Sequence, residues 1–471
     1  MGKMFRARLL IVCSFLACET FASAQETQKQ KLDHQFQSAV AQYDAGRFTE
    51  AAAQLESLLP DVPNNFEVEE LLGLAYASLS QDAKAIEHLE AAVRLKPDSA
   101  AARTNLAASL SRAGKTELAG EQFRKALELE PRDYTANHNL GEFYIQSGKI
   151  ADARPLLERA QRINPSSYDN GYDLAMADFL TGRLDAARQL VQTMMRSKDT
   201  GELHNLLAQI EEKDGKFVAA ANEFGIAAHM DPSEDNLFDW GSELLLHRTY
   251  EPAIDVFRQG TLRYPASPRL QIGLGMTLYS RGLYEEAVKA LLAAADLSPS
   301  DARCYLFLSK AYDSSPTQAE EVIQRFRHYS ELEPNNALAQ YYYAMSLWKG
   351  KQAQGAGLNR QAVESLLKKS IELDGKLPEP HMQLGNLYAD QHEYERSIPE
   401  YVRALELNPN LPEAHYRLGT DYVHVGQKDR AQGEFDVYQK LRAQHMAELD
   451  KERAEVQQFV YSAKATSSIK P

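Results

Sequence analysis

Cysteine is scarce in this sequence, with three residues among 471, at Cys13, Cys18 and Cys304. The first two fall within the first 24 residues, so a chain that is processed there keeps Cys304 alone. A single thiol forms neither an internal disulfide nor a cysteine metal cluster. The pattern around Cys304 predicts a small buried side chain inside a helix. We therefore expect a fold that depends on side-chain packing and binds no metal.

Recognisable catalytic motifs are absent as well. The sequence contains no H-E-x-x-H, C-x-x-C, G-x-S-x-G or phosphate-loop pattern. Its twelve histidines are scattered, and His381 and His415 recur at the same place in successive segments. That recurrence indicates a repeated structural position and not a pair of metal ligands. The sequence predicts a protein that is not an enzyme and that has no cofactor.

Positive charge is in deficit, since 52 Lys and Arg stand against 66 Asp and Glu, for a formal net charge of -14. Binding to nucleic acid needs a basic patch or stripe, and no long one is present. Hydrophobic residues make up 44% and charged residues 25%, which is typical of a soluble folded chain. We therefore expect no nucleic-acid partner.

The apolar run near the N-terminus, residues 9–18, is too short to span a bilayer. It follows a basic segment and precedes Ala22-Ser23-Ala24, an A-x-A cleavage pattern. These features predict a signal peptide over 1–24 that is cleaved near Ala24. The mature chain would then be exported, periplasmic or secreted, with no transmembrane span.

Two alternatives to a cleaved signal peptide stay open. One is an uncleaved membrane anchor. The other is a lipid anchor at Cys18, because Phe15-Leu16-Ala17-Cys18 resembles a bacterial lipoprotein box.

A repeat dominates the rest of the sequence. Pro63, Pro97, Pro131 and Pro165 are each 34 residues apart, and similar text recurs between them. Leu72-Gly73-Leu74-Ala75-Tyr76 is followed by Leu140-Gly141-Glu142-Phe143-Tyr144 two periods later. Twelve such segments begin near Leu32, Phe66, Ala100, Tyr134, Tyr168, Gly201, Glu234, Pro268, Ala302, Ala337, Pro378 and Pro412. A fixed period of this size indicates stacked helical hairpins and not an irregular helical bundle.

Four positions in each segment support this interpretation. The eighth residue is small in every segment, which lets the two helices of a hairpin approach closely. The twentieth is Ala in nine segments, and a proline that ends the second helix closes nine. A glycine marks the turn between helices in seven. Pro155, Pro252 and Pro399 are expected near the start of second helices, where backbone N–H groups are unpaired.

These features resemble the tetratricopeptide repeat family, whose pattern is L-G-x-x-Y, then A-x-x-x-F, then P. The resemblance implies an all-α fold, a right-handed α-solenoid superhelix of tetratricopeptide helix hairpins, of the exported bacterial type. It also implies a non-enzymatic scaffold that binds a protein or peptide partner in the cell envelope or outside the cell. Two alternatives are an accessory subunit of an envelope export or polysaccharide-secretion machine, and a substrate-recognition partner of an enzyme on another chain.

The predicted organisation follows the repeat. A signal peptide over 1–24 precedes a polar spacer over 25–31, the repeat array over 32–445, a capping helix over 446–461 and a disordered tail over 462–471. The apolar stripe of 446–461 is also compatible with a partner-binding helix. Segment five lacks its closing proline and has Asp199 there, and the Gly- and Gln-containing insertion 349–358 predicts a flexible loop.

A candidate binding surface comes from helix geometry, because positions two, five, nine and twelve of each first helix share one face. In tetratricopeptide proteins this face lines the peptide groove. In segments five and seven to ten it carries aromatic and apolar side chains, and Arg can pair with a carboxylate of a bound peptide. The alternative, which the sequence does not decide, is that these side chains form core between repeats. The predicted groove residues are Tyr172, Met176, Phe179, Phe238, Arg269, Ile272, Met276, Tyr279, Arg303, Leu306, Tyr341, Met345 and Trp348.

Overall fold

The computed structural model describes residues 29–315, 318–354 and 359–444, and all regular structure within those ranges is α-helical. The chain divides into two compact units, 1–198 and 199–471. The division falls at Asp199, where segment five lacks its proline. Described helices of the first unit are 29–44, α2 Phe48–Leu58, α3 Phe66–Ser78, α4 Asp82–Leu95, α5 Ala100–Arg112, α6 Thr116–Leu129, α7 Tyr134–Gln146, α8 Ile150–Ile163, α9 Tyr168–Leu180 and α10 Leu184–Ser197.

The second unit continues the same pattern. Its described helices are α11 Gly201–Lys213, α12 Phe217–Met230, α13 Glu234–Leu246, α14 Tyr250–Arg263, α15 Pro268–Arg281, α16 Tyr284–Leu297, α17 Ala302–Ser314, α18 Ala319–Leu332, α19 Ala337–Gln354, α20 Arg360–Leu373, α21 Pro378–Ala389, α22 Tyr394–Leu407, α23 Pro412–His424 and 428–444. Among the described residues, no helix is both long enough and apolar enough to cross a membrane.

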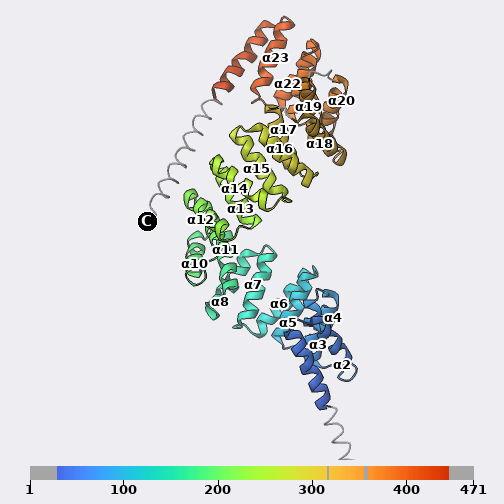
Figure 1. The fold of residues 1–471 in the computed structure, drawn as a ribbon, viewed down its shortest axis with the longest axis vertical. Coiled ribbons are helices and arrows are strands. Elements are labelled where there is room, and N and C mark those ends of the chain that lie inside the picture. The colour runs from blue at the N-terminus through green and yellow to red at the C-terminus, as the bar shows by residue number, and fades with distance from the viewer. Residues whose placement is uncertain (1–28, 316–317, 355–358, 445–471) are drawn as a thin grey trace, which may run out of the picture. The chain divides into compact units, whose positions relative to one another are not determined.

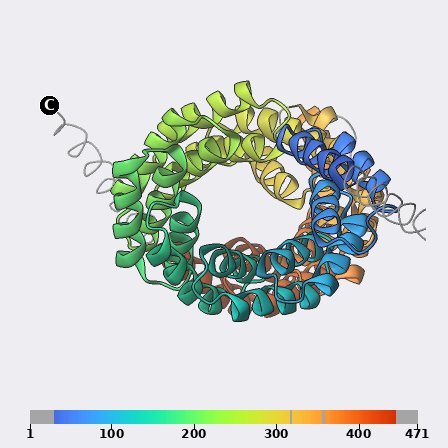
Figure 2. The ribbon, with the colours of Figure 1, turned by 90° about the horizontal axis from the view of Figure 1, so that it is seen from below.

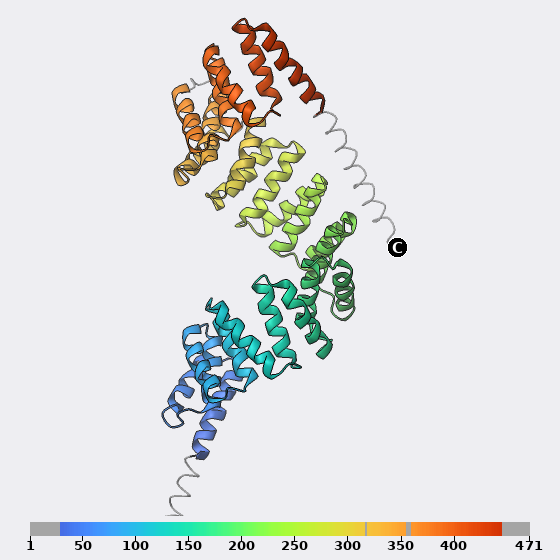
Figure 3. The ribbon, with the colours of Figure 1, turned by 180° about the vertical axis from the view of Figure 1, so that it is seen from behind.

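Within each unit most consecutive helices pair into hairpins, and neighbouring hairpins pack on one another. Within the first unit α3 pairs with α4, α5 with α6 and α7 with α8, and α4 and α6 also contact the first helix that follows them. The hairpins of α13 to α16 are stacked in the same way in the second unit (Figure 1). In the green to yellow part of the second unit the helices form two rows (Figure 2), and the blue to teal hairpins of the first unit repeat the stacking (Figure 3). The prediction of an all-α repeat of helical hairpins is therefore confirmed.

Helix capping explains where the first helices begin. Asn65, Ser99, Asp133 and Ser167 each accept a hydrogen bond from a backbone N–H three residues further on, at the start of α3, α5, α7 and α9. Such side chains satisfy N–H groups that the helix leaves unpaired. The turn that follows each first helix needs a left-handed residue, which glycine adopts at no steric cost. Seven glycines occupy it as predicted: Gly46, Gly114, Gly148, Gly182, Gly215, Gly282 and Gly426.

The small residue at position eight lies where the two helices of a hairpin cross. A Cβ added to Gly73 would lie 2.5 Å from Cγ of Leu89, and one added to Gly385 would lie 2.7 Å from the Tyr401 ring. Only a small residue therefore fits at this crossing. The large side chain sixteen residues later fills the space, and Leu89 and Tyr401 are fully buried.

Prolines follow the prediction in one role and depart from it in another. Helix α4 ends at Leu95, two residues before Pro97, as expected of a closing proline. Pro155 and Pro399, however, lie inside α8 and α22, as the sixth helical residue of each. The expectation that they sit among the unpaired N–H groups of the first turn was wrong, since each removes an intrahelical hydrogen bond.

Two predicted boundaries also shift. Residues 349–354 of the insertion continue α19 and do not form a loop. Lys, Gln and Ala are good helix formers, so the composition there supports the helix. The first helix begins at residue 29, inside the predicted spacer. The predicted signal peptide, the capping helix over 446–461 and the tail over 462–471 lie outside the described residues.

Candidate functional site

Part of the predicted groove in the second unit reaches the surface. Met276 and Tyr279 of α15 are half-buried, and Leu306 of α17 is 37% exposed. Phe307, which was not predicted, lies next to Leu306, and its ring centroid is 6.4 Å from that of Tyr279 in an edge-to-face arrangement. We call Met276, Tyr279, Leu306 and Phe307 the α15–α17 patch. Three of its members, all except Leu306, also pack against the main core of this unit.

Three other predicted groove residues belong to the core. Ile272, Met345 and Trp348 are only 5%, 5% and 6% exposed. Met345 and Trp348 pack with side chains of α20 and α21, so the neighbouring helices cover them. Their burial favours the alternative that the sequence left open, in which these side chains form core between repeats, because stacking of hairpins buries their positions. Tyr341 is half-buried beside them, and burial raises its pKa.

The two predicted arginines already have carboxylate partners. Arg269 Nε donates to Glu234 Oε1 at 2.6 Å, and its Nη2 pairs with Asp235. Its guanidinium also lies 5.1 Å from the ring centroid of Phe238, which is half-buried. Arg303 pairs at 2.6 Å with Asp301, the residue that caps its own helix. Neither arginine therefore offers an unoccupied guanidinium to a peptide carboxylate.

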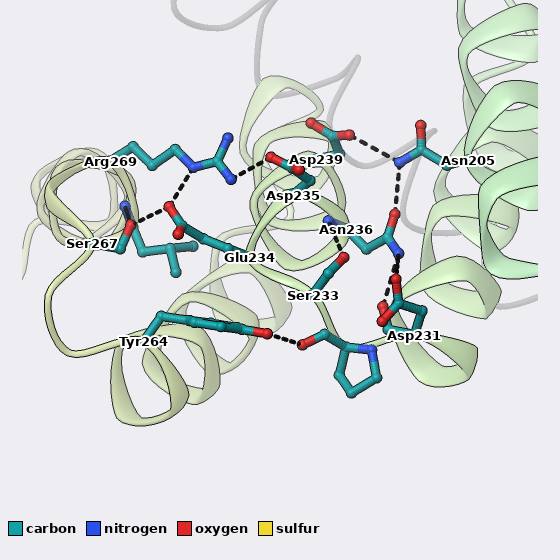
Figure 4. Close-up of polar contacts among 12 residues, drawn as sticks. Asn205, Asp231, Ser233, Glu234, Asp235, Asn236, Asp239, Tyr264, Ser267 and Arg269 are labelled. Atoms are coloured by element: carbon teal, nitrogen blue, oxygen red, sulfur yellow. Dashed lines mark hydrogen bonds and ion pairs between the residues drawn. The ribbon is translucent and has the colours of Figure 1, made fainter. Parts of the chain in front are cut away.

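Arg269 belongs to a set of polar contacts that joins neighbouring repeats of the second unit (Figure 4). Asn205 of α11 donates to Asn236 Oδ1 at 3.0 Å and to Asp239 Oδ2 at 2.9 Å, both on α13. Ser267, the cap of α15, donates to Glu234 at 2.6 Å. Burial raises the pKa of Asp239. These contacts fix the register of α11, α13 and α15, which is a structural role.

The predicted residues of the first unit, Tyr172, Met176 and Phe179, are half-buried on α9. A separate small pocket of this unit holds about 200 Å³ between α5, α6 and α7. Its lining is mixed: Ala108, Ser111, Arg112, Phe123, Asn139, Glu142, Phe143 and Gln146. With many polar groups and little volume, it is too small for a partner segment.

Sequence reasoning missed a larger cavity on the second-helix side of the second unit. It holds about 540 Å³ between α12, α13 and α14 and is lined by Ala228, His229, Pro232, Leu237, Trp240, Gln259, Leu262 and Arg263. Leu262 is 84% exposed. The sequence signal for this cavity is Leu262 itself. It is an apolar residue of α14 that lies outside the helix's buried stripe, which contains Ala253, Val256 and Phe257.

The recurring histidines behave as predicted. His381 Nδ1 lies 2.7 Å from Glu400 Oε2, and His415 Nδ1 lies 2.5 Å from Glu434 Oε2. In each case the two residues are 19 apart and join the helices of one hairpin. They are repeated structural pairs.

Comparison with known families finds repeats along much of the chain. One model described as "Tetratricopeptide repeat" matches residues 110–167 and 144–210, and another with the same description matches 36–100 and 238–302. A model described as "TPR repeat" matches 385–423. Together these stretches make up more than half of the sequence. No curated protein matches it.

The solved structures that match this chain share little sequence with it and have low TM-scores. "Structure of Naa15/Naa10 bound to HypK-THB" is 15% identical with a TM-score of 0.34 and covers 86% of this chain and 68% of that one. "Crystal structure of APC/C hetero-tetramer Cut9-Hcn1" is 14% identical with a TM-score of 0.39, and the match covers 92% of this chain and 93% of that one. "Functional Characterization of Pseudomonas Aeruginosa pilF" is 20% identical with a TM-score of 0.38, and the match covers 44% of this chain and 95% of that one. Values this low say nothing about the partner of this chain.

Proposed function

From the premise that this chain is built of tetratricopeptide repeats, we propose that it is a non-enzymatic scaffold that binds a segment of a partner protein. The binding surface is the α15–α17 patch of the second unit. Repeat scaffolds of this kind hold partners on extended faces of the stacked helices. The fold itself hosts many functions, so the argument depends on the surface and not on the fold.

The observation that carries the proposal is the exposure of apolar side chains on neighbouring first helices. Leu306 stands 37% exposed beside the half-buried Phe307, and Tyr279 meets Phe307 edge to face. Aromatic side chains that are partly buried in the free protein make rigid anchors for a partner, because little side-chain entropy is lost on binding.

Lys310 gives the partner its charge preference. Its ammonium lies 5.5 Å from the ring centroid of Phe307, on the same helix as Leu306. It has no ion pair with any residue that the structure describes, in contrast to Arg269 and Arg303. A partner segment with an apolar side chain next to an Asp or Glu fits this arrangement, since the acidic group pairs with Lys310 while the apolar one covers Leu306.

A capture experiment tests the scaffold. The purified chain is immobilised and exposed to an extract of its own source, beside a Leu306→Glu/Lys310→Glu variant. Both side chains are exposed, so circular dichroism and melting should match the parent. The control is Leu262→Glu, another exposed leucine, on the second-helix side. A partner that the parent and Leu262→Glu retain, and that the double variant loses, supports the proposal. Equal retention by all three would place binding elsewhere.

Export is a separate part of the proposal. We propose that the 1–24 segment directs export and is cleaved near Ala24, which places the scaffold in the cell envelope or outside the cell. Mass spectrometry of the protein from its source separates the outcomes. A new N-terminus at Gln25 supports cleavage, an acylated Cys18 supports the lipid anchor, and an intact N-terminus contradicts both.

The two narrower roles differ in what the partner does. An accessory subunit of an envelope export or polysaccharide-secretion machine predicts that loss of the chain reduces a secreted product. If the chain is instead the substrate-recognition partner of an enzyme, an enzymatic activity should copurify with it. The Leu306→Glu/Lys310→Glu variant should lose that activity.

A further inference from the structure

Three potential metal ligands meet where α11 and α13 lie side by side in the second unit. Glu212 is near the end of α11, and Glu243 and His247 are one turn apart at the end of α13. His247 Nε2 lies 3.3 Å from Glu243 Oε1 and 3.4 Å from Glu212 Oε2. One ligand atom from each residue lies within 4.8 Å of the other two.

The carboxylate of Glu243 adds a second observation that points to a ligand at this cluster. Glu243 is only 5% exposed. Its Oε1 lies at ion-pair distance from His247 Nε2 but makes no hydrogen bond to any residue that the structure describes. Buried polar atoms in folded proteins are rarely left without a partner, and an exception often marks an ion or a water. A cation between the three side chains satisfies this oxygen.

The spacing of the ligand atoms fits a small four-coordinate ion. Zinc binds His nitrogen and carboxylate oxygen at about 2.0–2.2 Å, so two ligands of a tetrahedron are about 3.4 Å apart. The distances from His247 Nε2 to Glu243 Oε1 and to Glu212 Oε2, 3.3 and 3.4 Å, are close to this ligand–ligand distance. Calcium and magnesium prefer sites made of oxygen alone and more ligands, so they fit this set poorly.

The surroundings support a site that is held in place and still open. The ring of Phe217 lies 4.3 Å from that of His247, centroid to centroid, and packs against the imidazole. The side chain of Glu212 is 29% exposed, so the cluster is reached from solvent. An ion that enters from that side keeps a water as its fourth ligand.

We propose that Glu212, Glu243 and His247 bind a divalent transition-metal ion of the zinc class, with water in the fourth position. The ion connects α11 to α13 and thereby ties one hairpin of the second unit to the next. This inference is independent of the partner-binding patch, because it uses none of that patch's residues. Binding of the ion makes the stability of the scaffold depend on the metal, since an ion that binds only the folded chain stabilises it.

The test uses the purified, tag-free, metal-stripped chain and zinc chloride as the probe. Isothermal titration calorimetry at pH 7.5 in a non-coordinating buffer measures stoichiometry and affinity, and a thermal melt with and without zinc measures stabilisation. Cobalt chloride then serves as a spectroscopic probe of four-coordinate geometry. Variants are Glu212→Gln, Glu243→Gln and His247→Gln, each checked for folding by circular dichroism.

The control variant is His381→Gln, which removes a His from a His–Glu pair that has no third potential ligand beside it among the described residues. We expect one zinc site per chain, a higher melting temperature with zinc, and a loss of affinity of about tenfold or more in each of the three site variants. His381→Gln should bind zinc as the parent does. If zinc does not bind, or if the three variants bind it as tightly as the parent, the proposal is overturned. Glu212→Gln keeps the test decisive, because its side chain is 29% exposed and the variant is therefore expected to fold.

Discussion

Gly275 of α15 faces Leu291 of α16 so closely that a Cβ on the glycine would lie 2.4 Å from the leucine Cγ. Leu291 is fully buried, so it has little room to move. We predict that Gly275→Ala lowers the free energy of unfolding by about 1–3 kcal/mol, because overpacking forces shifts in a closely packed core. Urea denaturation measures the change.

Gly433 provides the matched control, since it also lies in a helix, 428–444, and a Cβ there would meet nothing within 4 Å. Gly433→Ala should leave stability unchanged or raise it by about 0.5–1 kcal/mol through better helix propensity. If both alanine variants behave alike, close approach at the eighth position does not limit the hairpin.

Cys304, the one cysteine among the described residues, is expected to be inert in the folded protein. Cys304 is fully buried and its Sγ donates to the Asp301 carbonyl oxygen at 2.9 Å. Burial raises the pKa of the thiol to about 12. Because only the thiolate reacts, labelling with a disulfide reagent at pH 8 should be about a hundredfold slower than for an unstructured cysteine.

The measurement uses a chain with Cys13 and Cys18 replaced by Ser, so that Cys304 alone is observed. Guanidinium should restore full labelling. Rapid labelling without denaturant would show that the helix α17 opens readily, contrary to its packing.

A buried carboxyl group should make stability depend on pH. Asp421 is buried in α23, and desolvation raises its pKa, against the hydrogen bond that Ser397 donates to it. In the unfolded chain an Asp titrates near pH 3.9. The native form therefore retains the proton to higher pH than the unfolded form, and this group's contribution to stability falls as pH rises from about 4 through its raised pKa.

Asp421→Asn removes that dependence. We predict that it stabilises the chain at pH 7–8, with the gain shrinking toward pH 4, as measured by urea denaturation across the range. Asp436→Asn, an exposed site, should show no such trend. A variant that is destabilised equally at every pH would contradict this account and point to a lost hydrogen bond.

The hairpins were predictable because their determinants are local and repeat. The small eighth residue, the turn glycine and the closing proline each act within one segment, and Gly73, Gly114 and Pro97 do what the pattern indicates. The continuation of α19 through 349–354 was missed because the three glycines of the insertion 349–358 dominated the interpretation, although only one of them lies in the helical stretch.

The candidate surface was less predictable, because exposure depends on the neighbouring repeat. Leu306 and Trp348 belong to the same helical face by position, yet one is exposed and the other is covered by α20 and α21. Partners of Arg269 lie 34 and 35 residues away, on the preceding first helix. The Glu212 cluster joins two repeats, and its only local signal is Glu243 four residues before His247.

Site-specific photo-crosslinking tests the central claim, that a partner binds the α15–α17 patch, most directly. A photoreactive amino acid at position 306 is compared with one at position 262, and both replace exposed leucines of the second unit. The account predicts a crosslink to the captured partner from 306 and none from 262, with the crosslink lost when Lys310→Glu is added. A crosslink from 262 and none from 306 would contradict it and place the partner at the cavity of α12 to α14.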